Sequence, residues 1–258
     1  MNLNNFYKNG YDIFSLNNKD VINSLNQDIF KFTCKYFNDL DIKKELKNPD
    51  FFLNNFHQLK IGDDKINKYR IDLYNYINTN EKLLKKIFKV LKKDLIEILG
   101  PDIVGQKKVG LVIQRPKDTG VFPIHRDAPP NSNHEIVFWI PLVNCFGTKN
   151  MSIIDRHKNL KILEMFSKNN KNQYTKIQSF YKKNGKLNNI NKGQAMVFWT
   201  GLFHYIPINK ETSTRWSLNL RFKNLFSPYG IKGYPDYFKL MEKSKLTELV
   251  LEYEKKKL

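Results

Sequence analysis

The 258-residue chain is long enough to bury a substantial core, and 41% of its residues are hydrophobic, which is typical of a globular protein. Its opening residues lack the charged-then-apolar order of a secretory signal, and no apolar run is long enough to span a membrane. The chain has only two cysteines, Cys34 and Cys145, which argues against a disulfide framework. We therefore expect a cytoplasmic protein without a membrane span.

The formal net charge of +19 would suit a nucleic-acid partner, but most of the 44 basic residues are lysines. An AT-rich genome would encode such a lysine-rich and asparagine-rich chain whatever its function, so we expect no nucleic-acid partner. Against that background, an arginine indicates a place that needs its rigid fork of donors. Five of the six arginines lie between residues 115 and 221: Arg115, Arg126, Arg156, Arg215 and Arg221.

Two amphipathic helices are predicted in the first hundred residues, at 18–40 and 80–99, because apolar side chains recur there at helical spacing. Asn78 and Glu81 have the spacing of a capping box for the second helix, and Gly100-Pro101 would end it. Five lysines of the second helix lie largely away from its apolar stripe. They predict a solvated face rather than a site for an anionic partner.

After residue 105 the pattern changes to short segments that are rich in β-branched and aromatic residues and are separated by turn signals, which predicts strands. Residues 155–192 are polar, show no clear period and are interpreted as a long insertion, a candidate lid. We expect a single domain, 1–258, with a mainly helical region at 1–104, a β core at 105–230 and a helical tail at 231–258. The four strand segments are VGLVIQRP, EIVFWIPLV, GQAMVFWTG and TRWSLNLRF.

A short segment, FPIHRDAPP, places His125 and Asp127 two residues apart after a predicted strand. On an extended backbone such residues point the same way, so an imidazole and a carboxylate would converge. Taken alone, the pair more often forms an ordinary hydrogen bond than a metal site. His204 follows another predicted strand, and Arg215 follows His204 by eleven residues.

Arg215 opens a strand with two different faces. Arg215, Ser217, Asn219 and Arg221 share one face, while the alternate residues are large and apolar, which predicts an anion-binding cavity on one side and a packed core on the other. Two histidines and one carboxylate form the facial triad of non-haem Fe(II) oxygenases. Such a triad leaves positions that can chelate 2-oxoglutarate, whose distal carboxylate an arginine would bind with two parallel hydrogen bonds.

This combination resembles the Fe(II)/2-oxoglutarate-dependent dioxygenases of the phytanoyl-CoA-hydroxylase-like branch. Three segments, HRDAPPNSNHEIVFWIPLV, GTKNMSIID and HYIPINKETSTRWSLNLRF, are similar to the streptomycin-biosynthesis and sporadic-carbohydrate-cluster oxygenases. The resemblance covers roughly residues 95–230. It implies an α+β fold with a double-stranded β-helix core (a jelly roll, cupin-like), with N-terminal helices packed on it and a C-terminal helix.

The resemblance also implies roles for individual residues and two cofactors, Fe(II) and 2-oxoglutarate. His125, Asp127 and His204 would be the catalytic metal ligands. Arg215 would hold the distal carboxylate of 2-oxoglutarate. The further residues expected to line the cosubstrate pocket are Trp139, Ser217, Asn150 and Gln114.

The resemblance suggests a sugar or nucleotide-linked sugar as the small-molecule substrate, in surface-polysaccharide or antibiotic-sugar biosynthesis. Three residues are candidates for substrate contacts. Arg126 is either a surface ion pair or a contact to a substrate phosphate. Arg221 is either a buried structural pair or a contact to substrate or cosubstrate, and His134 is a candidate loop or gate residue.

Two other functions fit parts of the pattern. A nucleic-acid dealkylating dioxygenase would share the chemistry, and Arg215 with Arg221 forms an arginine pair like that of the nucleobase-repair enzymes. The gap from His204 to Arg215 is, however, shorter than in that group. A non-catalytic cupin-like binding protein is the third candidate, although sugar binding by itself does not require a triad and an arginine together.

Overall fold

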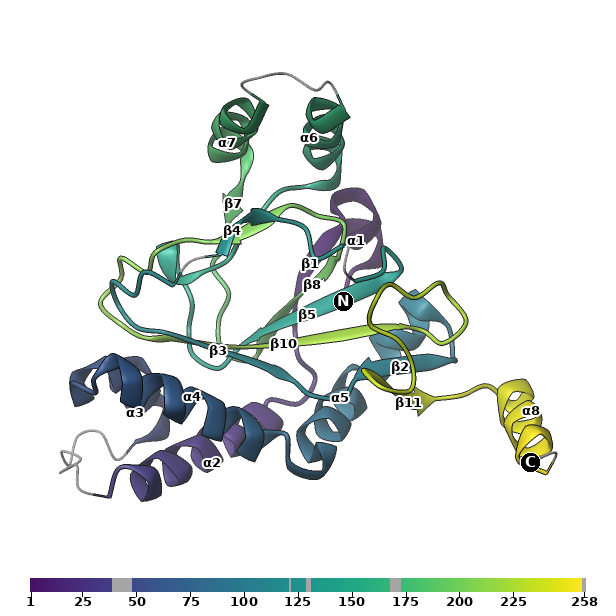
Figure 1. The fold of residues 1–258 in the computed structure, drawn as a ribbon, viewed down its shortest axis with the longest axis horizontal. Coiled ribbons are helices and arrows are strands. Elements are labelled where there is room, and N and C mark those ends of the chain that lie inside the picture. Colours follow the sequence, from purple (N-terminus) through teal and green to yellow (C-terminus); the bar gives the residue numbers. More distant parts are fainter. Residues whose placement is uncertain (39–47, 121, 129–130, 168–172, 257–258) are drawn as a thin grey trace.

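Two antiparallel β-sheets form the centre of the molecule in this computed structural model, which describes residues 1–38, 48–120, 122–128, 131–167 and 173–256 (Figure 1). The larger sheet has seven strands in the order β1-β8-β5-β10-β2-β11, and β3 pairs with the first half of β10. The long strand β10 thus pairs with three strands, β2, β3 and β5. The strands are β1 (Tyr11–Ser15), β2 (Ile103–Gln106), β3 (Gly110–Gln114), β5 (Glu135–Pro141), β8 (Gln194–Trp199), β10 (Arg215–Asn224) and β11 (Phe238–Glu242).

A smaller sheet of four short strands, in the order β4-β9-β6-β7, lies on one side of the larger sheet (Figure 1). The strands predicted from the sequence correspond to β3, β5, β8 and β10, while most of the smaller sheet was not predicted. Its strands are too short to show an alternating pattern. They are β4 (Phe122–His125), β6 (Ser152–Ile153), β7 (Lys186–Leu187) and β9 (His204–Ile206).

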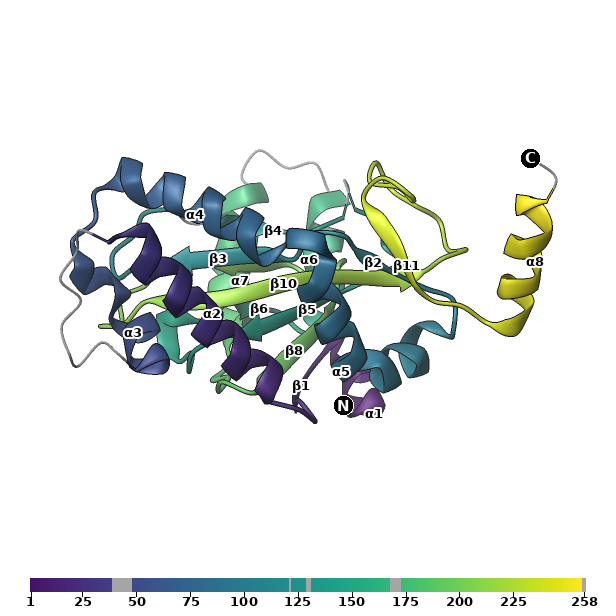
Figure 2. The ribbon, with the colours of Figure 1, turned by 90° about the horizontal axis from the view of Figure 1, so that it is seen from below.

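Helices cover the other side of the larger sheet (Figure 2). Trp216 of β10 is fully buried there, donates its indole N–H to the carbonyl of Leu53 at 2.9 Å and lies edge-on to Phe56. Farther along β10, the ring of Phe222 packs on Phe88. The apolar face predicted for this strand is therefore the core face. The covering helices are α2 (Asp20–Tyr36), α3 (Pro49–Asn55), α4 (Asp63–Ile77) and α5 (Lys82–Leu99), with short 3-10 turns at Phe56–Leu59 and Thr79–Glu81.

The predicted capping box of the second helix is wrong. Glu81 has a left-handed backbone and makes no capping hydrogen bond, and α5 begins only at Lys82. The Asn78 side chain instead accepts the backbone N–H of Val109 at 2.6 Å and donates to the carbonyl of Tyr74. Asn78, which local spacing predicted as a helix cap, thus makes a tertiary contact with Val109, just before β3. The first helix is α2, and residues 39–40 of its predicted span lie outside the described part of the chain.

The predicted insertion contains two helices, α6 (Arg156–Ser167) and α7 (Gln173–Asn184), which stand beside each other beyond the smaller sheet (Figure 1). They form a second small core with Ile154 and Phe203. Because this small core needs few apolar residues, α6 and α7 show only a weak helical period of apolar residues in the sequence. The regions at both ends contain strands as well as helices: α1 (Leu3–Asn9) precedes β1, and α8 (Lys245–Lys255) follows β11. Within the described residues, no helix combines the length and hydropathy needed to cross a bilayer.

Candidate metal centre

The two sheets bring His125, Asp127 and His204 to one point. His125 ends β4 and His204 begins β9, and the strand register places these residues directly opposite each other. The Nε2 atom of each histidine lies 3.9 Å from Oδ1 of Asp127. One ligand atom from each of the three residues lies within 4.8 Å of the others. This spacing suits a single metal ion bound between them.

Backbone carbonyls fix the orientation of both imidazole rings. Nδ1 of His125 lies 2.7 Å from the carbonyl of Pro123, and Nδ1 of His204 lies 2.9 Å from that of Leu202. A carbonyl can only accept, so each Nδ1 donates its proton there, and in the neutral ring Nε2 is the nitrogen that can bind a metal. Metal-binding histidines are commonly oriented in this way. Burial also lowers the pKa of His204 to about 4, so its ring is neutral at neutral pH.

Asp127 divides its two oxygens between the histidines and a buried arginine. Nη2 of Arg221 donates to Oδ2 of Asp127 at 2.9 Å, which leaves Oδ1 facing the two Nε2 atoms. Burial alone would raise the pKa of Asp127, but the charge of Arg221, with a smaller effect of His204, lowers it instead. The carboxylate is therefore ionised, as a metal ligand must be. Arg221 thus forms a buried ion pair with Asp127, while its contact to substrate or cosubstrate stays a prediction.

Two partners of Arg221 were not anticipated from the sequence. Nη1 of Arg221 lies 3.4 Å from Oε1 of Gln106 on β2, and the hydroxyl of Tyr237 is hydrogen-bonded to the guanidinium. Gln106 is far from Arg221 in sequence and follows no motif. Only the pairing of β10 with β2 brings them together. No local signal in the sequence could have identified these contacts.

Four of the five predicted cosubstrate residues lie on the face of the larger sheet that carries Arg221, while Asn150 follows the 3-10 turn Gly147–Lys149 outside the sheet. In the strand register, Arg215 is opposite Gln114, and Asn219 is opposite Trp139. Directly opposed residues of antiparallel strands point to the same face. Arg215, Ser217, Trp139 and Gln114 therefore share one face, and all four are buried, Arg215 with only 1% of its surface exposed. This surface is called the inner face below.

The inner face carries an unusual concentration of buried polar atoms without hydrogen-bond partners. Within the described residues twelve buried side-chain atoms lack a partner, and six of them belong to the predicted cosubstrate residues. Such atoms are costly unless a ligand or water satisfies them. Donors and acceptors are both present, which suits a polar ligand. The six atoms are Nε and Nη1 of Arg215, Oγ of Ser217, Nε1 of Trp139, Oδ1 of Asn150 and Oε1 of Gln114.

Arg215 is the most costly member of this group. Burial lowers its pKa to about 10, and none of the described carboxylates pairs with it. A buried cation without a counter-ion is strongly unfavourable, and an anionic ligand would remove that cost. The inner face therefore fits a ligand with a carboxylate at the Arg215 end. Together with the His-Asp-His centre, these residues fit Fe(II) and 2-oxoglutarate.

The substrate candidates lie in different places. Arg126, between two triad residues, places its guanidinium 5.3 Å from the ring centre of Phe203, a cation–π contact rather than an ion pair. His134 is exposed and borders a separate hollow of about 350 Å³, which Tyr7, Arg156 and Trp199 also line. The structure thus places Arg126 beside the triad and His134 at another surface.

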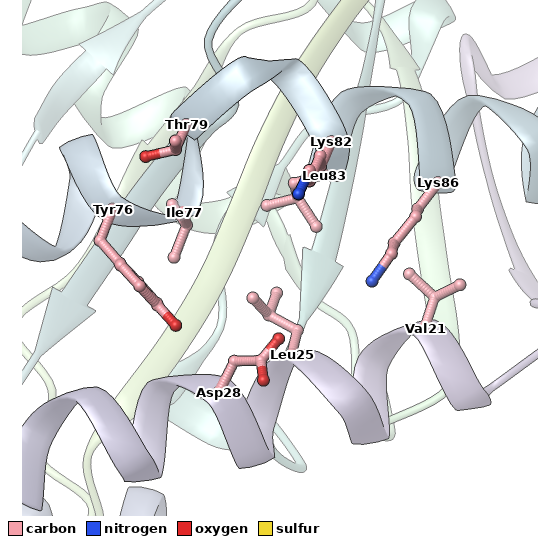
Figure 3. Close-up of a pocket in the computed structure, with 9 residues that line it drawn as sticks. All are labelled: Val21, Leu25, Asp28, Tyr76, Ile77, Thr79, Lys82, Leu83 and Lys86. Atoms are coloured by element: carbon pink, nitrogen blue, oxygen red, sulfur yellow. The ribbon is translucent and has the colours of Figure 1, made fainter.

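A further hollow of about 450 Å³ lies among the covering helices, between α2 and the junction of α4 with α5 (Figure 3). Asp28 and Lys86 point towards its interior, and apolar residues such as Leu25 and Leu83 form much of its wall. It contains a single carboxylate and no histidine or cysteine. None of the inner-face residues lines it, so it is unrelated to the metal centre.

Comparison with known proteins places the fold. No family model and no curated protein matches the chain. Among solved structures, the chain is similar to the nickel complex of the non-haem monooxygenase ThoJ, with a TM-score of 0.52 and 12% identity over 95% of this chain and 84% of that one. AviO1 from Streptomyces viridochromogenes Tue57 gives a TM-score of 0.52 at 13% identity, over 88% of this chain and 95% of that one.

At this level of identity the similarity establishes the fold alone. The chain is thus a mixed helix-and-sheet protein with the fold of a non-haem monooxygenase. It carries a His-Asp-His group that could hold a metal ion.

Proposed function

We propose that this protein is an Fe(II)- and 2-oxoglutarate-dependent dioxygenase with a double-stranded β-helix core. One observation carries the proposal: a three-ligand metal centre and a buried arginine without a counter-ion occur in the same molecule. Arg215 shares the inner face with Arg221, and Arg221 pairs with the candidate metal ligand Asp127. A metal site alone would not require Arg215. A carboxylate-binding site alone would not require two oriented imidazoles and a carboxylate.

In this proposal His125, Asp127 and His204 would hold Fe(II), as the two histidines and one carboxylate of non-haem Fe(II) oxygenases do. When bound, the metal and 2-oxoglutarate supply the O2-dependent oxidation of a substrate C–H bond. Arg215 and Ser217 bind the distal carboxylate of 2-oxoglutarate. The other atoms without partners, on Trp139, Asn150 and Gln114, are available to the rest of the cosubstrate.

The chain's own residues contribute orientation and exclusion of water. The carbonyls behind the two histidines hold their Nε2 atoms towards the metal, and Arg221 holds the Asp127 carboxylate through its other oxygen. The burial of Arg215 and Ser217 keeps water from competing for the carboxylate.

For the substrate we propose a carbohydrate, such as a sugar or nucleotide-linked sugar of surface-polysaccharide or antibiotic biosynthesis. The support is the similarity of three sequence segments to carbohydrate-cluster oxygenases and the presence of a cation, Arg126, beside the triad. We also propose that residues 1–258 form one domain: a helical region at 1–104, an oxygenase core at 105–230 with the insertion 155–192, and a tail at 231–258. The buried face of β10, packed on the helices, supports a single domain.

The test is an anaerobic titration of the metal-free protein with Fe(II) and then 2-oxoglutarate, followed by the visible charge-transfer absorption of the chelated cosubstrate. We expect this absorption in the wild type, its loss in His125→Ala and a much weaker affinity in Arg215→Ala. His157→Ala is the matched control, because His157 is exposed and outside the centre. If the wild type shows no absorption at any concentration, the proposal fails and a non-catalytic binding protein becomes the better explanation.

A further inference from the structure

Lys149 is a buried cation that the proposed function does not use. It ends the 3-10 turn Gly147–Lys149, immediately before Asn150, and none of its surface is exposed. Its Nζ atom donates to Oδ1 of Asn54 and to Oγ of Ser213, both at 2.8 Å. Both acceptors are neutral. Ser213 lies two residues before Arg215, so this hydrogen bond links Lys149 to the start of β10.

No carboxylate in the described chain forms an ion pair with Lys149. Burial lowers its pKa to about 8, the charge of Glu211 opposes this shift, and the charge of Arg215 adds to it. Glu211 is half-buried, and one of its oxygens accepts the N–H and hydroxyl of Thr148. Burial raises the pKa of Cys145 to about 11, so this thiol is neutral at physiological pH.

Arg215 and Lys149 are therefore both buried cations without a counter-ion among the described residues, linked through Ser213 and the start of β10. Two buried like charges near each other are unfavourable unless an anion approaches both. Charges in a poorly solvated site also act over longer distances than charges in water. A carboxylate at Arg215 would lie in the field of Lys149 as well, even without touching it.

We propose that Lys149 is a positioning residue for the cosubstrate: it supplies a second positive charge at Ser213, beside the start of β10 where Arg215 lies, and thereby strengthens selection for a 2-oxo acid with a distal carboxylate. This inference rests on the proposed function and adds a selectivity determinant to it. It has two consequences. Affinity for 2-oxoglutarate falls as pH rises through about 8, where Lys149 loses its proton. Affinity for a monocarboxylic 2-oxo acid does not fall in this way.

The experiment compares the dissociation constants of 2-oxoglutarate and 2-oxopentanoate, which has the same chain length without the distal carboxylate. Binding to the metal-loaded protein is measured anaerobically by calorimetry and by the charge-transfer absorption, between pH 7 and pH 9. For Lys149→Met we expect the preference for 2-oxoglutarate to fall roughly tenfold, the change that corresponds to about 1.4 kcal/mol. The loss of affinity above pH 8 should disappear at the same time.

Two further variants separate charge from structure. Lys149→Arg keeps its charge at all of these pH values, so it should retain the preference and lose the pH dependence. Lys223→Met is the matched control. Lys223 is equally buried and burial also lowers its pKa to about 8, but its ammonium donates to the carbonyls of Ser227 and Pro228 and it has no contact with Arg215 or Lys149.

The outcomes distinguish this inference from the function on which it rests. If the wild type binds neither acid, the proposed function itself fails. If the wild type prefers 2-oxoglutarate and Lys149→Met weakens both acids equally, Lys149 is structural and only the inference is overturned. If the lysine variants do not fold, the wild-type pH series decides: a preference that stays constant from pH 7 to pH 9 overturns the inference.

Discussion

The two faces of β10 differ in how completely their side chains are satisfied. On the outer face, Trp216 is buried against α3 and the indole N–H has a carbonyl partner. On the inner face, Arg215 and Ser217 are equally buried, yet their polar atoms have no partners in the described chain. The indole N–H on the outer face has its partner within the chain, whereas the buried polar atoms on the inner face are left for a ligand or water. One strand therefore contributes stability on one side and binding on the other.

The largest effect on stability should come from the outer face. Trp216→Ala removes a fully buried indole and leaves the carbonyl of Leu53 without its donor, so we expect the free energy of unfolding to fall by about 3–5 kcal/mol. Urea denaturation measures this loss. Ser217→Ala, on the inner face of the same strand, is the control and should change stability by much less. Similar losses in the two variants would contradict the division of β10 into two faces.

The metal centre should make the metal-free protein sensitive to acid. Burial lowers the pKa of His204 from its ordinary 6.5 to about 4, so the unfolded chain binds a proton at a higher pH than the folded one. Stability is therefore lost as pH falls from about 6.5 towards 4, by on the order of 3 kcal/mol. Denaturation midpoints measured across this range should show the slope. His204→Gln should flatten it, and an unchanged slope in that variant would assign the effect to other groups.

Removing Arg221 should weaken the metal site without removing a ligand. In Arg221→Met the Asp127 carboxylate loses its partner at Oδ2 and its orientation, so we expect about 10–100-fold weaker metal affinity, as for other groups that orient metal ligands. Calorimetric titration with Fe(II) or Zn(II) provides the measurement. Arg221→Lys should recover part of the affinity. Equal affinity in Arg221→Met and wild type would show that the buried pair has no role in metal binding.

The smallest effect should have the opposite sign. Arg215→Met removes a buried cation that has no counter-ion. Without cosubstrate, the free energy of unfolding of this variant should therefore exceed that of the wild type by at least about 1 kcal/mol. The same variant should lose most of its affinity for 2-oxoglutarate. Thermal unfolding with and without the cosubstrate tests both statements. A destabilised ligand-free variant would mean that Arg215 supports the fold rather than waiting for an anion.

Much of the two-faced pattern was predictable because it depends on local spacing. The alternation along Arg215–Phe222 indicates which side chains share a face. The same rule led to the prediction that His125 and Asp127 converge, although β4 ends at His125 and Asp127 lies just beyond it. The helical period likewise predicted α2 and α5 to within a few residues. The helices α6 and α7 were missed, since each buries few apolar residues against a small separate core.

The sequence by itself determined the candidate ligands and the polar side of β10, because strand alternation requires no knowledge of neighbouring elements. Tertiary structure decided the partners. β10 pairs with β5 and with both β2 and β3, and this register sets Gln114 beside Arg215 and Gln106 beside Arg221. Tertiary packing also gave the Asn78 side chain a partner in Val109 instead of the predicted helix cap. It buried Lys149 within the electrostatic influence of Arg215. Such contacts join residues that are distant along the chain, and their geometry depends on strand register and burial, which local spacing does not encode.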